Sequence, residues 1–258
     1  MKVFITGASS GIGAALLRAC AARGDDCTLL SRRLDVLEAL RHRLPRPASH
    51  RCHAVDVTDA QALADVARRS IAESGLPDIV IANAGISGGT DTSDPDDLAA
   101  FRRIVETNLI ATVATFGPFI AAMKAAAPTP GGFRLVVIAS VAGIRGIPGS
   151  GAYSASKAAV IAYAESLRIE LRGSPIRVVI VAPGFIDTPM TVGNPYPMPF
   201  LMDVDAFAAR ALHVIDAGRS FAVIPWQMAW VARLLRILPD AWFDAALAGR
   251  GRKPKLRP

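Results

Sequence analysis

The chain has 258 residues, of which 52% are apolar and 20% are charged, and its mean hydropathy is +0.34. These values exclude a disordered chain, which combines low hydropathy with high charge, and they fit one large α/β domain. The three cysteines lack the spacing of metal ligands, so neither a zinc module nor a disulfide scaffold is expected. We expect a cytoplasmic protein, because we find no signal peptide and no run of about 20 uninterrupted apolar residues.

The net charge of +7 is concentrated toward the C-terminus. Residues 225–258 hold seven Lys or Arg and two acidic residues, which leaves the rest of the chain nearly neutral. No helix-turn-helix pattern and no basic patch with interleaved aromatic residues accompanies this charge. The charge distribution therefore argues against a nucleic acid partner.

Short β-branched runs alternate with alanine-rich stretches along most of the chain. The expected strands are Lys2–Thr6, Asp26–Ser31, His53–Asp56, Asp78–Ala82, Phe133–Ser140, Ile176–Ala182 and Ser220–Ile224. The expected helices are Gly11–Arg23, Leu34–Arg43, Asp59–Glu73, Asp96–Ala127, Gly151–Arg172 and Asp203–Ala217. This alternation predicts right-handed βαβ units, and hence a Rossmann-type, doubly wound parallel sheet of about seven strands with helices on both faces.

The alternation of strands and helices ends near Ile224. We therefore expect residues 1–224 to form one domain and residues 225–258 to form a helical C-terminal extension. Within the domain, residues 185–202 are rich in Pro and Met and fit neither the helical nor the strand period. Such a segment is typical of a long irregular loop that covers an active site.

A glycine-rich turn, Gly7-x-x-x-Gly11-x-Gly13, follows the first expected strand and opens the first helix. Glycines let the chain reverse sharply and let the backbone approach a pyrophosphate, while the helix N-terminus offers free N–H groups. The spacing differs from G-x-G-x-x-G, and a glycine turn after a strand is often only a turn. Its place in the first βα unit favours a dinucleotide-binding site.

The second expected strand ends in Ser31-Arg32-Arg33, at the place where an acidic residue would bind the ribose diol of NAD. No carboxylate stands there to repel a 2′-phosphate, and two guanidinium groups can bind one bidentately. We therefore predict that NADP(H) is preferred over NAD(H). The alternative is that Arg32 and Arg33 are solvated side chains at the start of a helix.

Tyr153 and Lys157 lie four residues apart in an expected helix, so they share one face. A phenol with a pKa of about 10 is a poor acid or base at neutral pH, but a neighbouring ammonium favours the ionised form. Ser140 ends an expected strand, and ligands of open parallel sheets bind at the carboxyl ends of strands. A substrate carbonyl could therefore accept a hydrogen bond from Ser140.

Together these motifs resemble the short-chain dehydrogenase/reductases, in their single-domain branch of about this length. The resemblance covers roughly residues 1–224, and all its motifs occur in the order found in the family. They are Thr6-Gly7-x-x-x-Gly11-x-Gly13, Asp56-Val57, Asn83-Ala84-Gly85, Asn108, Ser140, Tyr153-x-x-x-Lys157 and Pro183-Gly184. Because the family's Asn-Ser-Tyr-Lys tetrad is complete, the resemblance implies an NAD(P)H-dependent enzyme that acts on CH–OH or C=O groups.

The resemblance implies a role for each member of the tetrad. Tyr153 would donate the proton in reduction and act as the base in oxidation, while Ser140 would hold and polarise the substrate carbonyl. Lys157 would lower the pKa of Tyr153 and hydrogen-bond the nicotinamide ribose. Asn108 would support a water that connects Lys157 to solvent protons. The structural alternatives are a turn cap for Asn108, a helix cap for Asp56 and a strand end for Ser140.

The resemblance also implies the cofactor contacts. Asp56 and the Val57 backbone would meet the adenine, Asn83–Gly85 would line the cofactor, and Pro183–Thr188 would reach the carboxamide end of the nicotinamide. The full expected set is Gly7, Ser9, Ser10, Gly11, Ile12, Gly13, Ser31, Arg32, Arg33, Asp56, Val57, Asn83, Ala84, Gly85, Tyr153, Lys157, Pro183, Gly184, Ile186 and Thr188. No metal site is expected.

The loop formed by residues 185–202 is expected to lie over the substrate. Its apolar and aromatic residues include Met190, Tyr196, Met198, Phe200, Leu201 and Met202, and it contains no Lys or Arg. Such a loop favours an apolar or lipid-like ketone, although these side chains could instead pack on the body or on a partner subunit. The expected substrate contacts are Ser140, Ile144, Ile147, Tyr153, Phe185 and Met190.

We therefore predict an NADPH-preferring reductase that converts a ketone to a secondary alcohol. Two alternatives stay open: an NAD-dependent alcohol dehydrogenase working in the oxidative direction, and a non-catalytic redox sensor that binds NADPH. The complete tetrad counts against the sensor, because a sensor has no need of both Tyr153 and Lys157. The family resemblance implies a homodimer or a homotetramer.

The C-terminal extension carries a pattern of its own. Trp226–Leu238 reads as an amphipathic helix, Asp240–Ala248 as a second short one, and five cations follow in the last nine residues. Amphipathic helices with aromatic residues beside a basic run are typical of interfacial membrane binding. An anionic membrane surface, at the inner face of a membrane, is therefore one expected partner. The alternative is that these helices pack on the body or across a subunit interface.

Overall fold

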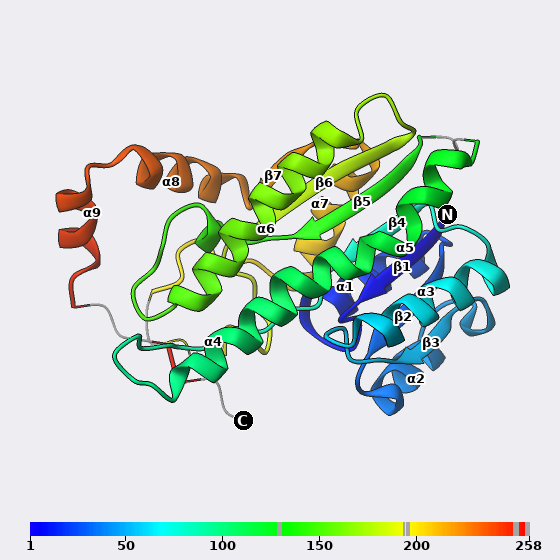
Figure 1. Cartoon of the computed structure of the whole chain (residues 1–258), viewed down its shortest axis with the longest axis horizontal. Helices are drawn as coiled ribbons and strands as arrows, with labels where there is room; N and C mark the ends of the chain where they lie inside the picture. The colour runs from blue at the N-terminus through cyan, green and yellow to red at the C-terminus, as the bar shows by residue number, and fades with distance from the viewer. Residues whose placement is uncertain (128–130, 193, 195–196, 250–252, 256–258) are drawn as a thin grey trace.

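The computed structural model describes residues 1–127, 131–192, 194, 197–249 and 253–255. Its seven strands are β1 Lys2–Thr6, β2 Asp26–Ser31, β3 Arg51–Ala54, β4 Ile79–Ala82, β5 Phe133–Ile138, β6 Ile176–Pro183 and β7 Phe221–Ile224. They form one parallel sheet in the order β3-β2-β1-β4-β5-β6-β7 (Figure 1), which confirms the doubly wound arrangement. Tyr196 of the expected loop, and Arg250, Arg252 and Arg257 of the five expected C-terminal cations, lie outside the described residues.

Helices cover both faces of this sheet. They are α1 Gly11–Ala22, α2 Leu34–His42, α3 Ala60–Ser74, α4 Asp97–Val105, α5 Ala111–Ala125, α6 Gly151–Glu170 and α7 Val204–Asp216. Alternate residues of a strand point to opposite faces, so Val3 and Ile5 join the cluster under α1, α2 and α7, whereas Phe4 joins the cluster under α3, α5 and α6. Both faces are thus buried, as the continuous apolar strands predict.

The prediction of one uninterrupted helix over 96–127 is wrong. This stretch is divided into α4 and α5 by a π-helical turn at Glu106–Ile110, and Asn108 lies buried in that turn. By length and composition alone, Asp97–Ala125 could cross a membrane, with a mean hydropathy of 1.4. In the fold, however, α4 packs against α6, and α5 packs against α3, β4 and β5, so the stretch belongs to the helical layer on one face of the sheet.

The third strand starts and ends two residues earlier than expected. The ladder continues only as far as a hydrogen bond from the Val55 backbone N–H to the carbonyl oxygen of Ser31. Asp56 is instead part of a turn, because its side chain accepts hydrogen bonds from the backbone N–H and the hydroxyl of Thr58, at 3.0 and 2.8 Å. The other element boundaries differ from the expected ones by no more than two residues.

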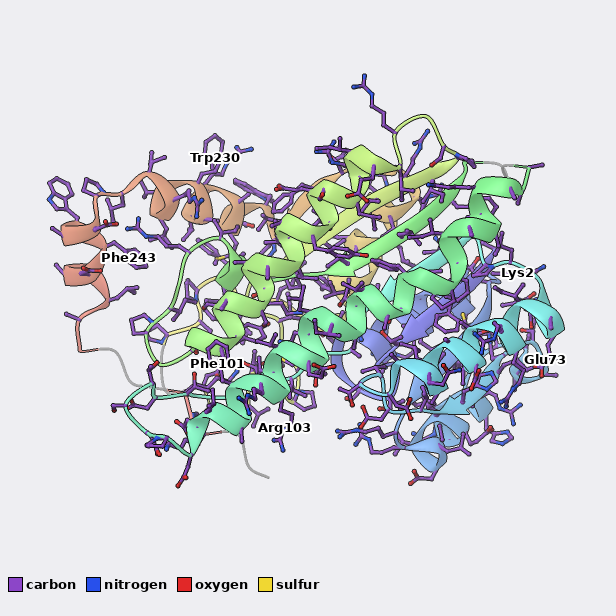
Figure 2. The ribbon with its side chains drawn as sticks, viewed as in Figure 1. Lys2, Glu73, Phe101, Arg103, Trp230 and Phe243 are labelled. Atoms are coloured by element: carbon purple, nitrogen blue, oxygen red, sulfur yellow. The ribbon has the colours of Figure 1, made fainter. Side chains whose placement is uncertain are left out.

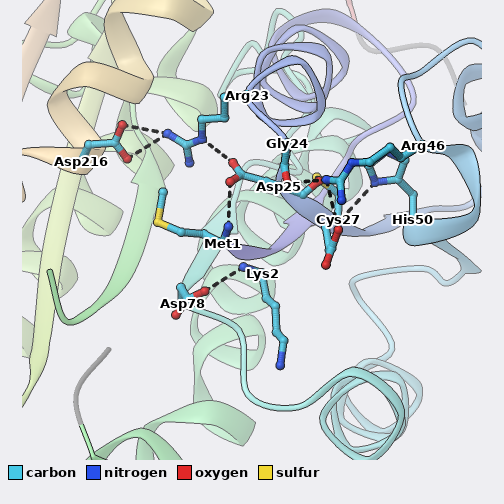
Figure 3. Close-up of polar contacts among 11 residues, drawn as sticks. Met1, Lys2, Arg23, Gly24, Asp25, Cys27, Arg46, His50, Asp78 and Asp216 are labelled. Carbon is cyan, nitrogen blue, oxygen red and sulfur yellow. Dashed lines mark hydrogen bonds and ion pairs between the residues drawn. The ribbon is translucent and has the colours of Figure 1, made fainter. Parts of the chain in front are cut away.

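Ionic contacts fasten the end of the sheet where the strands begin (Figure 3). Arg23, after α1, donates to both carboxylate oxygens of Asp216 at the end of α7, at 2.9 and 2.7 Å, and also pairs with Asp25. The backbone N–H of Lys2 donates to Asp78, just before β4, at 2.7 Å. Functional loops are therefore left to the opposite end, where the strands finish.

The described part of the C-terminal extension contains two helices, α8 Trp226–Ile237 and α9 Asp240–Leu247, which lie beside the sheet (Figure 1). Arg145, in the segment after β5, joins them to the body. Its guanidinium donates to the carbonyl oxygens of Leu235 and Leu238, pairs with Asp240 and lies 3.9 Å from the ring centroid of Phe243. Figure 2 shows Phe243 turned toward the body and Trp230 turned away from it.

Candidate active site

A cavity of about 650 Å³ opens at the carboxyl ends of the strands. Every residue expected to bind the cofactor lines it. Three expected substrate contacts, Ser140, Tyr153 and Met190, line the same cavity. The other three, Ile144, Ile147 and Phe185, are not part of its wall. The cofactor and the reacting group therefore share one continuous space.

The glycine turn has the shape that a pyrophosphate requires. Gly7 and Gly11 adopt positive φ angles of 67° and 52°, which favour glycine, and a Cβ on Gly13 would overlap the carbonyl oxygen of Gly7. The first turn of α1 holds no acidic residue, and its N-cap Ser10 makes no side-chain capping bond. The backbone N–H groups of this helix start can therefore face an anion in the cavity.

Two arginines lie at the adenine end of the cavity. A guanidinium nitrogen of Arg32 lies 3.9 Å from a carboxylate oxygen of Asp56, and the Arg32 side chain is 73% exposed. Arg33 donates to the hydroxyl of Ser9 in the glycine turn at 3.0 Å. Burial acts to raise the pKa of Asp56, but hydrogen bonds from Thr58 and the charge of Arg32 outweigh it and lower the pKa.

Lys157 is fully buried behind Tyr153 on α6. Its ammonium donates to the carbonyl oxygen of Ile138, at the end of β5, at 2.8 Å, and lies 5.9 Å from the ring centroid of Tyr153. Burial lowers the pKa of Lys157 to about 8. Ser140 follows β5 and opens the short turn Val141–Gly143, where its hydroxyl accepts from the backbone N–H of Ala142 at 3.1 Å. Strand β5 and helix α6 thus bring three tetrad residues together.

Asn108 joins three segments behind the cavity wall. Its carboxamide accepts from the backbone N–H of Ile86 at 2.8 Å and donates to the Ile86 carbonyl and the Ser156 hydroxyl, each at 3.0 Å. A Cβ on Gly85 would lie 3.2 Å from the Asn108 oxygen and 3.6 Å from the Lys157 nitrogen, so Gly85 keeps both groups close to the cavity. Asn108 therefore ties the loop after β4 to α6.

Sequence reasoning missed several residues of this site. Arg103 lines the cavity from the last turn of α4, and Thr107 lines it from the π-helical turn that follows. Ser156 accepts a hydrogen bond from Asn108. Lys253, from the C-terminal extension, lies 5.9 Å from the ring centroid of Tyr153. Only the fold brings Lys253 to Tyr153, so no local pattern signals it. Among the described residues, no group of three His, Cys, Asp or Glu side chains could hold a metal ion.

Comparisons with known proteins agree with this geometry. Residues 1–195 match the family model for short chain dehydrogenases. An uncharacterized oxidoreductase of Myxococcus xanthus is 39% identical over 94% of each chain. A cis-4-hydroxycyclohexanecarboxylate dehydrogenase of Sinomonas cyclohexanicum is 38% identical over 74% of this chain and 75% of its own.

A solved structure supports the same assignment. The alcohol dehydrogenase of Thermococcus sibiricus, complexed with 5-hydroxy-NADP, superposes with a TM-score of 0.75 and 27% identity, over 86% of this chain and 95% of its own. The sheet order, the cavity and the family match lead to one conclusion. The chain belongs to the short-chain dehydrogenase family and is an NAD(P)H-dependent oxidoreductase that acts on alcohols or ketones.

Proposed function

We propose that this protein reduces a ketone with an apolar body to a secondary alcohol, with NADPH as the preferred cofactor and Tyr153 as the proton donor. The observation that carries this proposal is the shared cavity, in which Ser140, Tyr153 and Lys157 lie with the whole set of expected cofactor residues. NADPH, when bound, supplies the hydride. Binding of the cofactor, positioning of the ketone and donation of the proton are carried out by residues of this chain.

The residues present fit a phosphorylated dinucleotide. Gly7 and Gly13 let the turn pack tightly against the start of α1, because a Cβ on either residue would meet atoms of Gly7, Asn83 or Ala84. A pyrophosphate could then approach the N-terminus of α1. Arg32 and Arg33 line the adenine end of the cavity and can share the 2′-phosphate between them. Arg33 is already bonded to Ser9, so Arg32, which is largely exposed, is the freer of the two to turn toward that phosphate.

The proton chemistry is assigned to α6 and the end of β5. The Tyr153 hydroxyl would donate its proton to the developing alkoxide, while Ser140 donates a hydrogen bond that holds the same oxygen. The Lys157 ammonium, 5.9 Å from the Tyr153 ring centroid, favours the phenolate left after donation. Asn108 keeps the loop after β4 against α6, which holds the wall around Lys157 in place.

The apolar character of the substrate is inferred from the loop that follows β6. Met190 lines the cavity beside Pro189 and Thr191, and the described part of the loop carries no cationic side chain. The relative from Sinomonas cyclohexanicum is named for a ring alcohol, which is a secondary alcohol of the class proposed here. A cyclic or linear ketone with a hydrocarbon body therefore fits both observations.

The test is the rate of NADPH oxidation with a panel of ketones graded by chain length. Tyr153→Phe is expected to lower turnover at least ~10²-fold while NADPH still binds, because it keeps the ring and removes the proton. Tyr163→Phe is the matched control, since Tyr163 lies on the same helix but is partly buried against the core, outside the cavity wall. Near-normal turnover by Tyr153→Phe would refute the assignment.

Two measurements separate the alternatives. Equal Michaelis constants for NADPH and NADH, with faster alcohol oxidation than ketone reduction, would favour an NAD-dependent dehydrogenase. Tight NADPH binding without turnover of any ketone or alcohol would favour a sensor. The buried Lys157 beside Tyr153 supports the enzyme. Burial lowers its pKa to about 8, and no carboxylate of the described residues pairs with it. Perturbed lysines of this kind are concentrated at functional sites, where their charge serves the chemistry.

We further propose that the extension binds an anionic membrane surface, which would place a cytoplasmic enzyme peripherally at the inner face of a membrane. The supporting observation is an exposed apolar surface on α8 and α9, formed by Trp226, Trp230, Leu234, Ile237 and Trp242. Arg233 lies 5.4 Å from the Trp230 ring centroid and adds charge to this surface. The same surface is the alternative contact for a partner subunit in a homodimer or homotetramer.

A further inference from the structure

The described C-terminal residues, 253–255, return to the segment before α4 (Figure 1). There Lys253 lies beside Met190 and Tyr153, at the mouth of the active-site cavity. The backbone N–H of Gly89 donates to the carbonyl oxygen of Pro254 at 2.8 Å, and Gly89 and Lys255 form an isolated parallel bridge. Lys255 pairs with Asp97 at 3.1 Å and with Asp94. These contacts anchor the segment beside the start of α4.

Gly89 allows residues 253–255 to approach the backbone closely. A Cβ on Gly89 would overlap the carbonyl oxygen of Lys253 and lie 3.3 Å from that of Pro254. Gly89 has no positive φ angle, so an alanine there would not strain the backbone. The absence of a side chain at Gly89 therefore serves the close approach of the C-terminal segment.

The neighbouring cation, Lys253, has a different environment from Lys255. Its ammonium donates to the Ser87 hydroxyl at 2.9 Å and to the Met190 carbonyl at 3.4 Å, and it lies 5.9 Å from the ring centroid of Tyr153. Tyr153 and Met190 both line the cavity. Within the described part of the chain, no carboxylate lies at ion-pair distance from Lys253, whereas Lys255 has two.

Among the described residues, the Lys253 ammonium has no anionic partner, although it lies beside Tyr153. Burial lowers the pKa of Lys253, with no compensating charge. The second cation near Tyr153, Lys157, is enclosed behind it and donates to the Ile138 carbonyl, so it cannot serve a ligand at the mouth. Hydroxyl and carbonyl contacts leave part of the positive charge of Lys253 unneutralised.

We propose that Lys253 binds an anionic group of the substrate, a carboxylate or a similar oxyanion, and so selects carbonyl compounds with an apolar body and an acidic end. This inference rests on the proposed ketone reduction at Tyr153 and narrows its substrate class. The apolar loop at Met190 would contact the hydrocarbon body, while Lys253 holds the acid at the mouth. The distance between carbonyl and acid then becomes a determinant of specificity.

A binding experiment tests this role without turnover. The full chain saturated with NADP⁺ is titrated by calorimetry with hexanoate and with hexanamide, which differ in charge but little in shape. The wild type is expected to bind hexanoate more tightly, and Lys253→Gln to lose roughly 10–100-fold of that affinity with no change for hexanamide. Lys253→Arg should restore much of it. Lys124→Gln, an exposed change on α5, controls for the loss of one positive charge.

Turnover gives the second readout, with methyl-ketone acids from 4-oxopentanoate to 8-oxononanoate and their methyl esters. Lys253→Gln is expected to raise KM for the acids roughly 10–100-fold, with esters and kcat little changed. Gly89→Ala, which displaces the segment, should show the same selective loss. Equal affinities for hexanoate and hexanamide in the wild type would overturn the proposal. A Lys253→Gln variant that is faster on both acids and esters would also overturn it, because that result means that residues 253–255 inhibit the enzyme. Absence of all turnover would refute ketone reduction, while the calorimetry still decides the role of Lys253.

Discussion

Replacing Lys157 by methionine is expected to stabilise the protein while it abolishes turnover. The pKa of this buried lysine falls from 10.5 to about 8. At about 1.4 kcal/mol for each pKa unit, the folded protein holds the charged ammonium at a cost of about 3 kcal/mol relative to the unfolded chain. A methionine of similar length fills the same space without this cost.

The net gain is smaller than the full desolvation cost. The substitution leaves the carbonyl oxygen of Ile138 without its 2.8 Å donor, which costs about 1 kcal/mol. The expected gain in the free energy of unfolding is therefore about 2 kcal/mol at pH 7. For a chain of 258 residues this raises Tm by about 4 °C.

The pH dependence distinguishes this cause from better packing. Below pH 8 the lysine is charged in the folded and unfolded states, so the full cost applies. Between about pH 8 and 10.5 the folded state releases the proton first, and the wild type becomes more stable relative to the variant. The advantage of Lys157→Met should therefore shrink to less than ~1 kcal/mol at pH 10.

The assay is thermal unfolding of the cofactor-free protein at pH 7 and pH 10. Lys124→Met, an exposed substitution, serves as the control and should show no such pH-dependent gain. A Lys157→Met variant less stable than the wild type at pH 7 would refute the reasoning, and so would a gain that is equal at both pH values. Either result would mean that the cost of burying the charge does not govern stability at this position.

Three further outcomes are expected. Arg32→Ala should weaken NADPH binding roughly 10–100-fold with little effect on NADH, and equal losses for both cofactors would contradict a 2′-phosphate contact. Replacing Trp230 and Trp242 by serine should abolish co-sedimentation with anionic vesicles at low salt, with neutral vesicles as the control; a wild type that stays in the supernatant refutes membrane binding. Asn108→Ala should lower Tm and kcat together, because it removes the hydrogen bonds that link Ile86 to α6. An unchanged Tm with lost activity would contradict this structural role and would mean that Asn108 acts only in the reaction.

Much of this fold follows from local signals. A continuous apolar strand followed by a glycine turn specifies β1, the turn and α1 together, because each element needs the next to bury its surface. The positions of Ser140 and Tyr153 follow in the same way, since a strand end and a helix face are fixed once the sheet is parallel. The tetrad could therefore be located before its geometry was known.

Other features depend on contacts that no local pattern carries. The π-helical turn at Asn108 lies in a stretch that is helical by propensity, and its side-chain bonds to Ile86 and Ser156 accompany the break. The early end of β3 depends on Asp56 bonding Thr58 rather than extending the ladder. In both cases a side-chain hydrogen bond competes with the regular backbone pattern. Sequence periodicity cannot predict which of the two forms, because it reports only the spacing of apolar residues.

The two lysines near Tyr153 differ in how the fold holds them, and this difference separates proton transfer from the proposed recognition of an acidic group. Lys157 is held by the interior, on α6 and against the end of β5, so its position cannot change without disturbing the sheet. Lys253 arrives on a terminal segment anchored by a few contacts at Gly89 and Lys255. Loops and termini tolerate substitution better than the elements that they join. Changes in the terminal segment should therefore alter which acids are accepted, through KM, while changes on α6 alter the rate of the proton transfer itself.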